Sequence, residues 1–197
     1  ESGKLLSQNH SFRRFQIGFF IAGSGIMFMK PSLPIFLTNQ HLSLFQLLSL
    51  FTIVDAIGFL IASPVWVNHL KNHNIHRTSS FVVACFAIHP ICLLLAWINP
   101  IFLFTASFFY GAAQAGSRLI WNMSGPILCG NASSTQYTSV NILAVSIRGS
   151  IVPLLGGIFS CFFGATHAFQ VGLLCLGVGS LYHLYASRQL ARLAALQ

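Results

Sequence analysis

The stretch SFVVACFAIHPICLLLAWI, residues 80–98, contains no Asp, Glu, Lys or Arg. A helix of about 20 predominantly apolar residues is long enough to cross the hydrocarbon core of a bilayer. The apolar run is continuous and lacks the alternation over roughly ten residues that is typical of membrane-barrel strands. Residues 80–98 are therefore predicted to form a transmembrane helix.

Five further stretches share this length and apolar character, and short polar segments or the turn pair Asn99-Pro100 separate them. They are Phe15–Leu37, Leu44–Val67, Ile101–Leu128, Thr135–Phe162 and Ala168–Ala186. The expected fold class is all-α. We expect a polytopic membrane protein with six transmembrane helices over residues 15–186, preceded by a cytoplasmic segment at 1–14 and followed by a cytoplasmic tail at 187–197.

The composition excludes a soluble domain. Of the 197 residues, 55% are hydrophobic and only 6% are charged, whereas soluble domains carry about 25% charged residues. The formal net charge is +8, but the aromatic residues lie inside apolar runs rather than among basic ones, so no nucleic-acid partner is expected. The expected partner is the lipid bilayer. The five cysteines lack CxxC spacing and are interpreted as small apolar side chains, with no metal site.

The distribution of Lys and Arg predicts the orientation. The segments before the first span, between the second and third, and after the sixth hold Lys4, Arg13, Arg14, Lys71, Arg77, Arg188 and Arg192. The other three connections, near residues 38–43, 99–100 and 163–167, hold no Lys or Arg. Because basic residues concentrate on the cytoplasmic side, we expect both termini in the cytoplasm and the chain in the plasma (inner) membrane.

Four ionisable residues fall inside the predicted spans: Lys30, Asp55, Arg118 and Arg148. From the helical rise of about 1.5 Å per residue, Arg148 lies about 20 Å and Asp55 about 17 Å into their spans, so both are placed near the midplane. An Asp55–Arg148 ion pair is the expected match. Charges inside a membrane usually face a cavity or a partner, and three cations against one acid would suit an anionic ligand.

Helical spacing adds Trp121 and Asn141 to this set. The expected substrate-binding or coupling residues are Lys30, Asp55, Arg118, Trp121, Asn141 and Arg148. The alternative left open is that Lys30 and Arg118 extend toward the two membrane surfaces, and that Asp55 and Arg148 form a structural pair only.

The enzyme signals are weak. His69, His73 and His76 lie in the second-to-third connection without an accompanying carboxylate or Cys, and are interpreted as a solvated loop. Ser24 in Ala22-Gly23-Ser24-Gly25, with His183 as a base, would be the pair for an intramembrane serine hydrolase. No phosphate-binding or dinucleotide fingerprint occurs, so no cofactor and no enzymatic activity are expected.

Three segments carry a family resemblance. Residues 63–77, with Pro64, Trp66 and Arg77, resemble the cytoplasmic loop motif of major facilitator superfamily transporters, although Val67 replaces the motif's Gly. Trp121-Asn122 with Pro126, and Arg148-Gly149 with Pro153, are similar to the tenth and eleventh helices of some members. The resemblance implies the C-terminal half of a 12-helix transporter, helices seven to twelve, that moves a small polar or anionic solute.

The length allows only six spans, so the expected partner is an N-terminal six-helix half or a second copy of the chain. A fragment or half of a split gene is therefore expected. The alternatives are a six-helix intramembrane enzyme and a non-transporting structural membrane protein that dimerises.

The orientation is testable by labelling single cysteines in a Cys-free background. A cysteine at position 73 is expected to react only from the cytoplasmic side, and one at position 40 only from the opposite side, because the basic segments stay inside. Reaction of both positions from the same side would contradict the predicted topology.

Overall fold

The computed structural model describes residues 9–38, 40, 42–130 and 132–194. The helices are α2 (His10–Met29), α3 (Ser32–Thr38), α4 (Leu44–Leu48), α5 (Asp55–Asn72), α6 (Ile75–Leu95), α7 (Ile101–Leu128), α8 (Ser134–Phe163) and α9 (Ala165–Ala194), with the π-helical turn η1 (Ser49–Val54) between α4 and α5. Within these ranges no strand occurs, which confirms the all-α fold class.

Two of the expected spans are irregular. The first is divided into α2 and α3 at Lys30-Pro31, because Pro31 has no backbone N–H to donate. A single turn, in which Leu33 N donates to the Lys30 carbonyl at 3.2 Å, connects the two helices. The second is continuous, but η1 inserts a wider turn just before Asp55. Such π-turns recur at functional sites. Neither the division at Lys30-Pro31 nor the π-turn is visible in the hydrophobic pattern.

Five helical segments are long and apolar enough to cross a membrane: His10–Thr38, Phe45–Asn72, Ile75–Leu95, Ser134–Phe163 and Ala165–Arg192. They correspond to five of the six expected spans. The remaining one, α7, has 28 residues but is less apolar, because Gln114, Arg118 and a row of small residues lie along it. Length and apolar content therefore do not identify α7 as a sixth span.

The helix ends extend beyond the apolar runs. Asn9 caps α2, its side chain accepting from Phe12 N at 2.9 Å, so the helix begins at His10 rather than at Phe15. At the other end, α9 continues to Ala194. Residues 10–14 and 187–194, expected to be a linker and a tail, are helical because polar and basic residues are compatible with helix. Residues 1–8 and 195–197 lie outside the described ranges.

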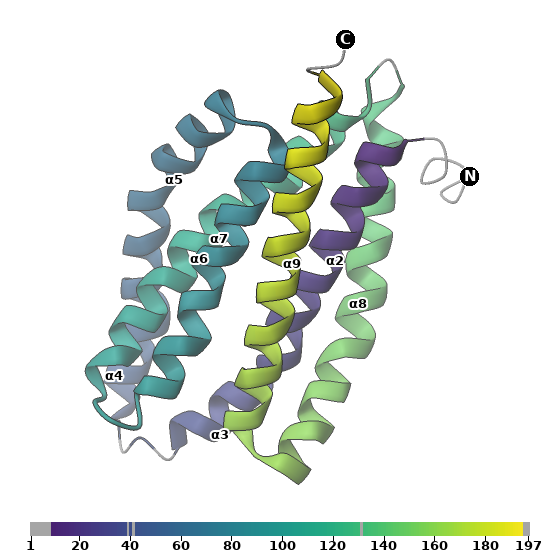
Figure 1. The fold of residues 1–197 in the computed structure, drawn as a ribbon. Coiled ribbons are helices and arrows are strands. Elements are labelled where there is room, and N and C mark those ends of the chain that lie inside the picture. The colour runs from purple at the N-terminus through teal and green to yellow at the C-terminus, as the bar shows by residue number, and fades with distance from the viewer. Residues whose placement is uncertain (1–8, 39, 41, 131, 195–197) are drawn as a thin grey trace.

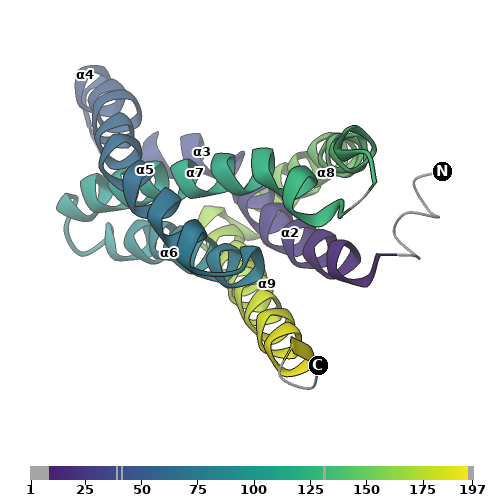
Figure 2. The same cartoon turned by 90° about the horizontal axis from the view of Figure 1, so that it is seen from above.

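The long helices alternate in direction (Figure 1), and the start of α2 and the end of α9 lie at the same end of the bundle. Seen from above, α6 and α9 lie toward one side and α7 and α8 toward the other (Figure 2). The helix contacts come in two matching sets. In one set α2 packs on α9 and α8 packs on α2; in the other α7 packs on α6 and α5 packs on α7. The two sets meet where α6 contacts α9. The groups α2-α5-α6 and α7-α8-α9 are thus arranged alike, with opposite directions.

Gly58 and Gly156 each permit a close contact between two helices. A Cβ on Gly58 in α5 would collide with the backbone of Phe108 in α7, and a Cβ on Gly156 in α8 would collide with the backbone of Phe28 in α2. Small residues allow helix backbones to approach in this way inside a membrane. These contacts hold α5 against α7 and α8 against α2.

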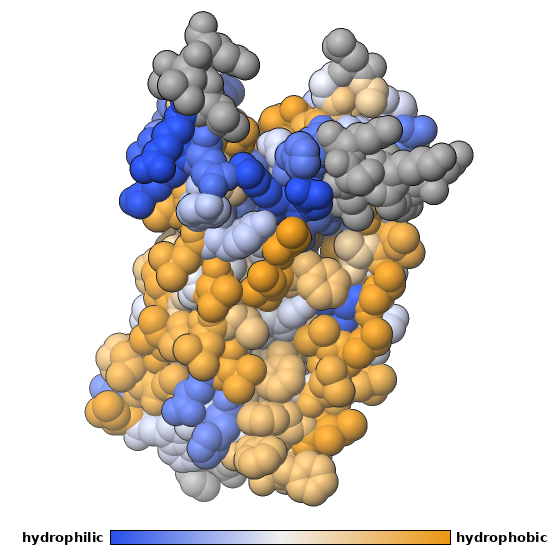
Figure 3. Space-filling view, turned by 45° about the vertical axis from the view of Figure 1, so that its right-hand side comes forward, coloured by the Kyte–Doolittle hydropathy of each residue, from blue (hydrophilic) through white to orange (hydrophobic). Residues whose placement is uncertain are grey.

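The outer surface is largely apolar. In the face of Figure 3, hydrophobic residues occupy the middle, and hydrophilic residues gather mainly at the end where α2 begins and α9 ends. Exposed side chains on α5 and α8 include Leu60 (70% exposed) and Leu154 (68%). A surface of this kind is typical of a protein that sits in a bilayer.

Packing at Gly156 can be tested against a matched glycine. Gly156→Ala is expected to destabilise the fold by about 1–3 kcal/mol, because the new methyl group meets the α2 backbone. Gly177→Ala in α9 is the control: nothing lies within 4 Å of its Cβ position, so it should be neutral or stabilising by about 0.5–1 kcal/mol. The measurement is thermal unfolding in detergent, and equal effects would contradict the close contact.

Candidate functional site

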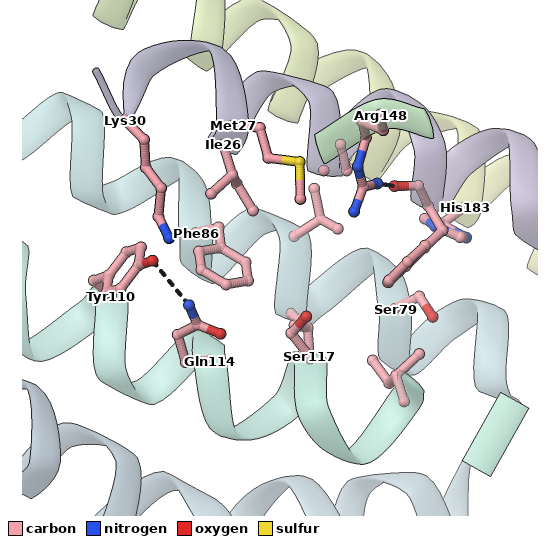
Figure 4. Close-up of a pocket in the computed structure, with 16 residues that line it drawn as sticks. Ile26, Met27, Lys30, Ser79, Phe86, Tyr110, Gln114, Ser117, Arg148 and His183 are labelled. Atoms are coloured by element: carbon pink, nitrogen blue, oxygen red, sulfur yellow. Dashed lines mark hydrogen bonds between the residues drawn. The ribbon is translucent and has the colours of Figure 1, made fainter. Parts of the chain in front are cut away.

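A pocket of about 200 Å³ lies between α2 and α7, about halfway along the bundle. It forms because these two helices make few direct contacts in the described chain, while α6 and α9 close the space from behind. Figure 4 shows its lining, which comes from five helices and one turn. The labelled residues are Ile26 and Met27 of α2, Lys30 of the turn after α2, Ser79 and Phe86 of α6, Tyr110, Gln114 and Ser117 of α7, Arg148 of α8 and His183 of α9.

Arg148 enters one end of the pocket from α8 and is only 5% exposed. Its Nη1 donates to the Phe19 carbonyl at 2.7 Å, and the guanidinium lies 5.2 Å from the Phe19 ring centroid. The side chain crosses α2 at Gly23, where any Cβ would collide with the guanidinium. Its buried Nε has no hydrogen-bond partner within the described ranges. Arg148 is thus a fixed, buried cation with an unused donor.

Lys30 lies at the other end of the pocket, beside Tyr110 (Figure 4). There Gln114 Nε2 donates to the Tyr110 hydroxyl at 2.8 Å. Lys30 and Tyr110 also line a second cavity of about 210 Å³, whose wall includes Asp55 and His89. The two cavities therefore adjoin, and Lys30 lies between Arg148 and Asp55.

Asp55 begins α5 directly after the π-turn and packs against Gly111 of α7. The cations whose charge acts on it are Arg118 and Lys30, and it shares an open cavity of about 430 Å³ with Arg118. Its buried Oδ1 has no hydrogen-bond partner among the residues that the structure describes.

The expected Asp55–Arg148 pair is wrong. The Arg148 guanidinium binds the Phe19 carbonyl instead, because α8 packs on α2 whereas α5 packs on α7. Matched depth placed both charges at one level, but depth does not determine the direction in which a side chain points.

Arg118 and Trp121 complete the outer part of the site on α7. Arg118 is exposed and lies 5.3 Å from the centroid of the Phe59 ring. The Trp121 ring packs 5.7 Å from that of Phe19, and both Arg118 and Trp121 line a shallow cavity with Arg148. Five of the six expected site residues therefore line adjoining cavities on the side of the bundle formed by α2, α5, α7 and α8.

Asn141, the sixth expected residue, lines none of these cavities. It is 1% exposed and joins three helices: its Nδ2 donates to Ser124 Oγ at 2.7 Å, and its Oδ1 accepts from Gln16. Asn141 thus faces the interior of the bundle, where it meets protein groups rather than open space.

Among the pocket residues, Ser79, Tyr110 and Ser117 were not expected. Gln114 lies one helical turn from Arg118, and this spacing indicates that the two side chains share one face of the helix. Ser79 and Tyr110 lie in apolar surroundings in the sequence, and only the helix packing directs them to the pocket.

His183 and His76 lie together behind α2. Both are fully buried, with their rings 6.1 Å apart, and His76 Nε2 lies 3.2 Å from Ser11 Oγ. The interpretation of His76 as part of a solvated loop is wrong, because α6 already begins at Ile75 and carries it inward. No group of three metal-ligating side chains occurs in the parts of the chain that were described.

Ser24 and His183 are not brought together. The Ser24 hydroxyl donates to the Phe20 carbonyl at 2.7 Å on a partly exposed face of α2. His183 belongs to α9 and is buried where it contacts Gly18 of α2. The geometry provides no activation of this serine by an imidazole.

Comparison of the chain with protein-family models, with curated proteins and with solved structures finds no match. The function is therefore inferred from the geometry of the site.

The electrostatic partner of Asp55 can be identified with double-mutant cycles. Asp55→Asn and Arg118→Gln are expected to be coupled by at least about 0.5 kcal/mol, since the two groups share a cavity. Asp55→Asn and Arg148→Gln should be additive within about 0.5 kcal/mol, because the two residues line none of these cavities in common. The measurement is unfolding in mixed detergent micelles; coupling to Arg148 alone would reverse the assignment.

Proposed function

We propose that this chain is one half of a secondary transporter of the major facilitator type, which moves a small polar or anionic solute through the pocket between α2 and α7. The observation that carries the proposal is the charged pocket at the junction of two similarly arranged, oppositely directed groups of three helices. Transporters place their substrate near the bilayer midplane, where structural repeats meet.

The helix arrangement supports the family. Each six-helix half of these transporters contains two inverted repeats of three helices, and the contact scheme of α2-α5-α6 and α7-α8-α9 has this form. In this proposal α7 is the sixth span. Its lower apolar content follows from its position, because α7 packs against α5, α6 and α8 and needs fewer lipid-facing side chains.

The charged residues exposed on one side of the bundle are evidence for a partner protein that covers this side. Lys30 and Arg118 are exposed there and Asp55 is half-buried, while charges that face lipid are costly. A second six-helix unit, either an N-terminal half or another copy of this chain, would cover this side and supply the opposite wall of the pathway. Both termini would then lie in the cytoplasm, as the positive-inside distribution predicts.

Reconstitution into liposomes tests the proposal. A chain shown to be monomeric is expected to take up labelled hexanoate, glucose or phosphate no faster than empty liposomes do, because it provides only one wall. When an N-terminal half or a second copy of the chain supplies the opposite wall, uptake should appear. Lys30→Gln should then reduce this uptake several-fold. The matched control is Lys71→Gln at the exposed end of α5, which should leave uptake unchanged.

Uptake by a monomer would contradict the two-wall arrangement. Equal effects of Lys30→Gln and Lys71→Gln would contradict the assignment of the pocket as the pathway.

A further inference from the structure

Arg148 is the one pocket cation that faces no acid in the described chain. The charge of Lys30 acts on Asp55, but Arg148 makes its hydrogen bonds to the carbonyls of Phe19 and Phe20 (2.7 and 3.5 Å) and lies over their rings. These neutral contacts hold the guanidinium in place and leave its positive charge uncompensated. Its buried Nε has no hydrogen-bond partner in the described chain either.

His183 is the second group at this end of the pocket. Its side chain is fully buried, and neither ring nitrogen has a hydrogen-bond partner among the described residues. Buried polar groups nearly always have partners, so an exception needs an explanation. Gly18 brings α2 against the ring, since a Cβ there would lie 2.7 Å from Nε2. A neutral imidazole still offers one N–H donor.

The two groups line one pocket. They contact α2 at Gly23 and Gly18, which are five residues apart: about 7.5 Å along the helix and about 140° around it. Figure 4 shows both at the same end of the pocket, away from Lys30 and Tyr110. A carboxylate that lies in the pocket between them can accept a charge-assisted bond of about 2.8 Å at each oxygen.

The rest of the pocket defines the body of the ligand. Between the two ends the wall includes Ile26, Val82 and Phe86, whose side chains offer an inorganic anion no hydrogen-bond donor. The volume of about 200 Å³ is several times the roughly 30 Å³ that a water molecule occupies in the liquid. The space therefore suits a small organic molecule with one anionic group and an apolar chain.

We propose that Arg148 and His183 together bind the carboxylate of an organic monoanion, whose apolar chain extends along α2 toward Lys30. This inference deepens the proposed function by naming the substrate class, and it rests on that function for its biological meaning. Binding itself can be measured without transport.

The test uses the full chain in lipid nanodiscs, with Trp fluorescence as the readout, since Trp121 packs on Phe19 beside Arg148. The probes are hexanoate, hexylammonium, 1-hexanol and inorganic phosphate, and empty nanodiscs correct for partition into lipid. Hexanoate is expected to bind saturably and at least about tenfold more tightly than each of the others, a difference that one charge-assisted hydrogen bond can supply.

Variants then assign the carboxylate to its donors. Arg148→Gln should weaken hexanoate binding at least about tenfold, whereas the matched control Arg77→Gln, at an exposed position on α6, should not change it. His183→Phe should also weaken binding, and His183→Gln, which keeps a donor, should restore most of it. If Arg148→Gln fails to fold, the comparison of His183→Phe with His183→Gln and the series of probes still decide the proposal.

Hexylammonium or hexanol binding as tightly as hexanoate would overturn the proposal, and so would tighter binding of phosphate or no binding of hexanoate. An equal loss in His183→Phe and His183→Gln would remove His183 from the site. Hexanoate binding without any uptake in liposomes would contradict the transport function alone, while uptake of another solute without hexanoate binding would contradict this inference alone.

Discussion

Backbone contact at two glycines is the constraint on which the rest of this bundle depends. Gly58 lets α5 meet the backbone of α7, and Gly156 lets α8 meet that of α2. Because α2 packs on α9, α7 packs on α6, and α6 contacts α9, α2 and α7 make few direct contacts in the described chain, and the pocket is the space between them. Helices in lipid lack a hydrophobic force that would draw them together, so close packing of this kind is what determines their arrangement.

Much of the fold could be predicted because the bilayer limits the possibilities. A spanning chain must satisfy its backbone hydrogen bonds internally, so apolar length alone identified the helices and excluded strands. The helix ends could not be predicted in this way: α2 begins at its Asn9 cap, and α9 continues through polar residues to Ala194. Hydropathy describes the solvent around a helix, whereas capping and propensity decide where the helix stops.

The candidate site was predictable in its composition and not in its pairings. Charges within apolar runs identified Lys30, Asp55, Arg118 and Arg148, since such residues are too costly to occur without a reason. The partner of Asp55 depended on which helix packs against which, and sequence spacing contains no such information. The burial of His183 behind α2 depends on Gly18, a residue on another helix far away in the sequence.

The guanidinium of Arg148 occupies the volume that a side chain at position 23 would need. A methyl group at position 23 would displace the guanidinium, which is the far end of a flexible side chain and can move aside. The path that Arg148 takes across α2 is thus open because of a glycine that precedes it by 125 positions in the chain.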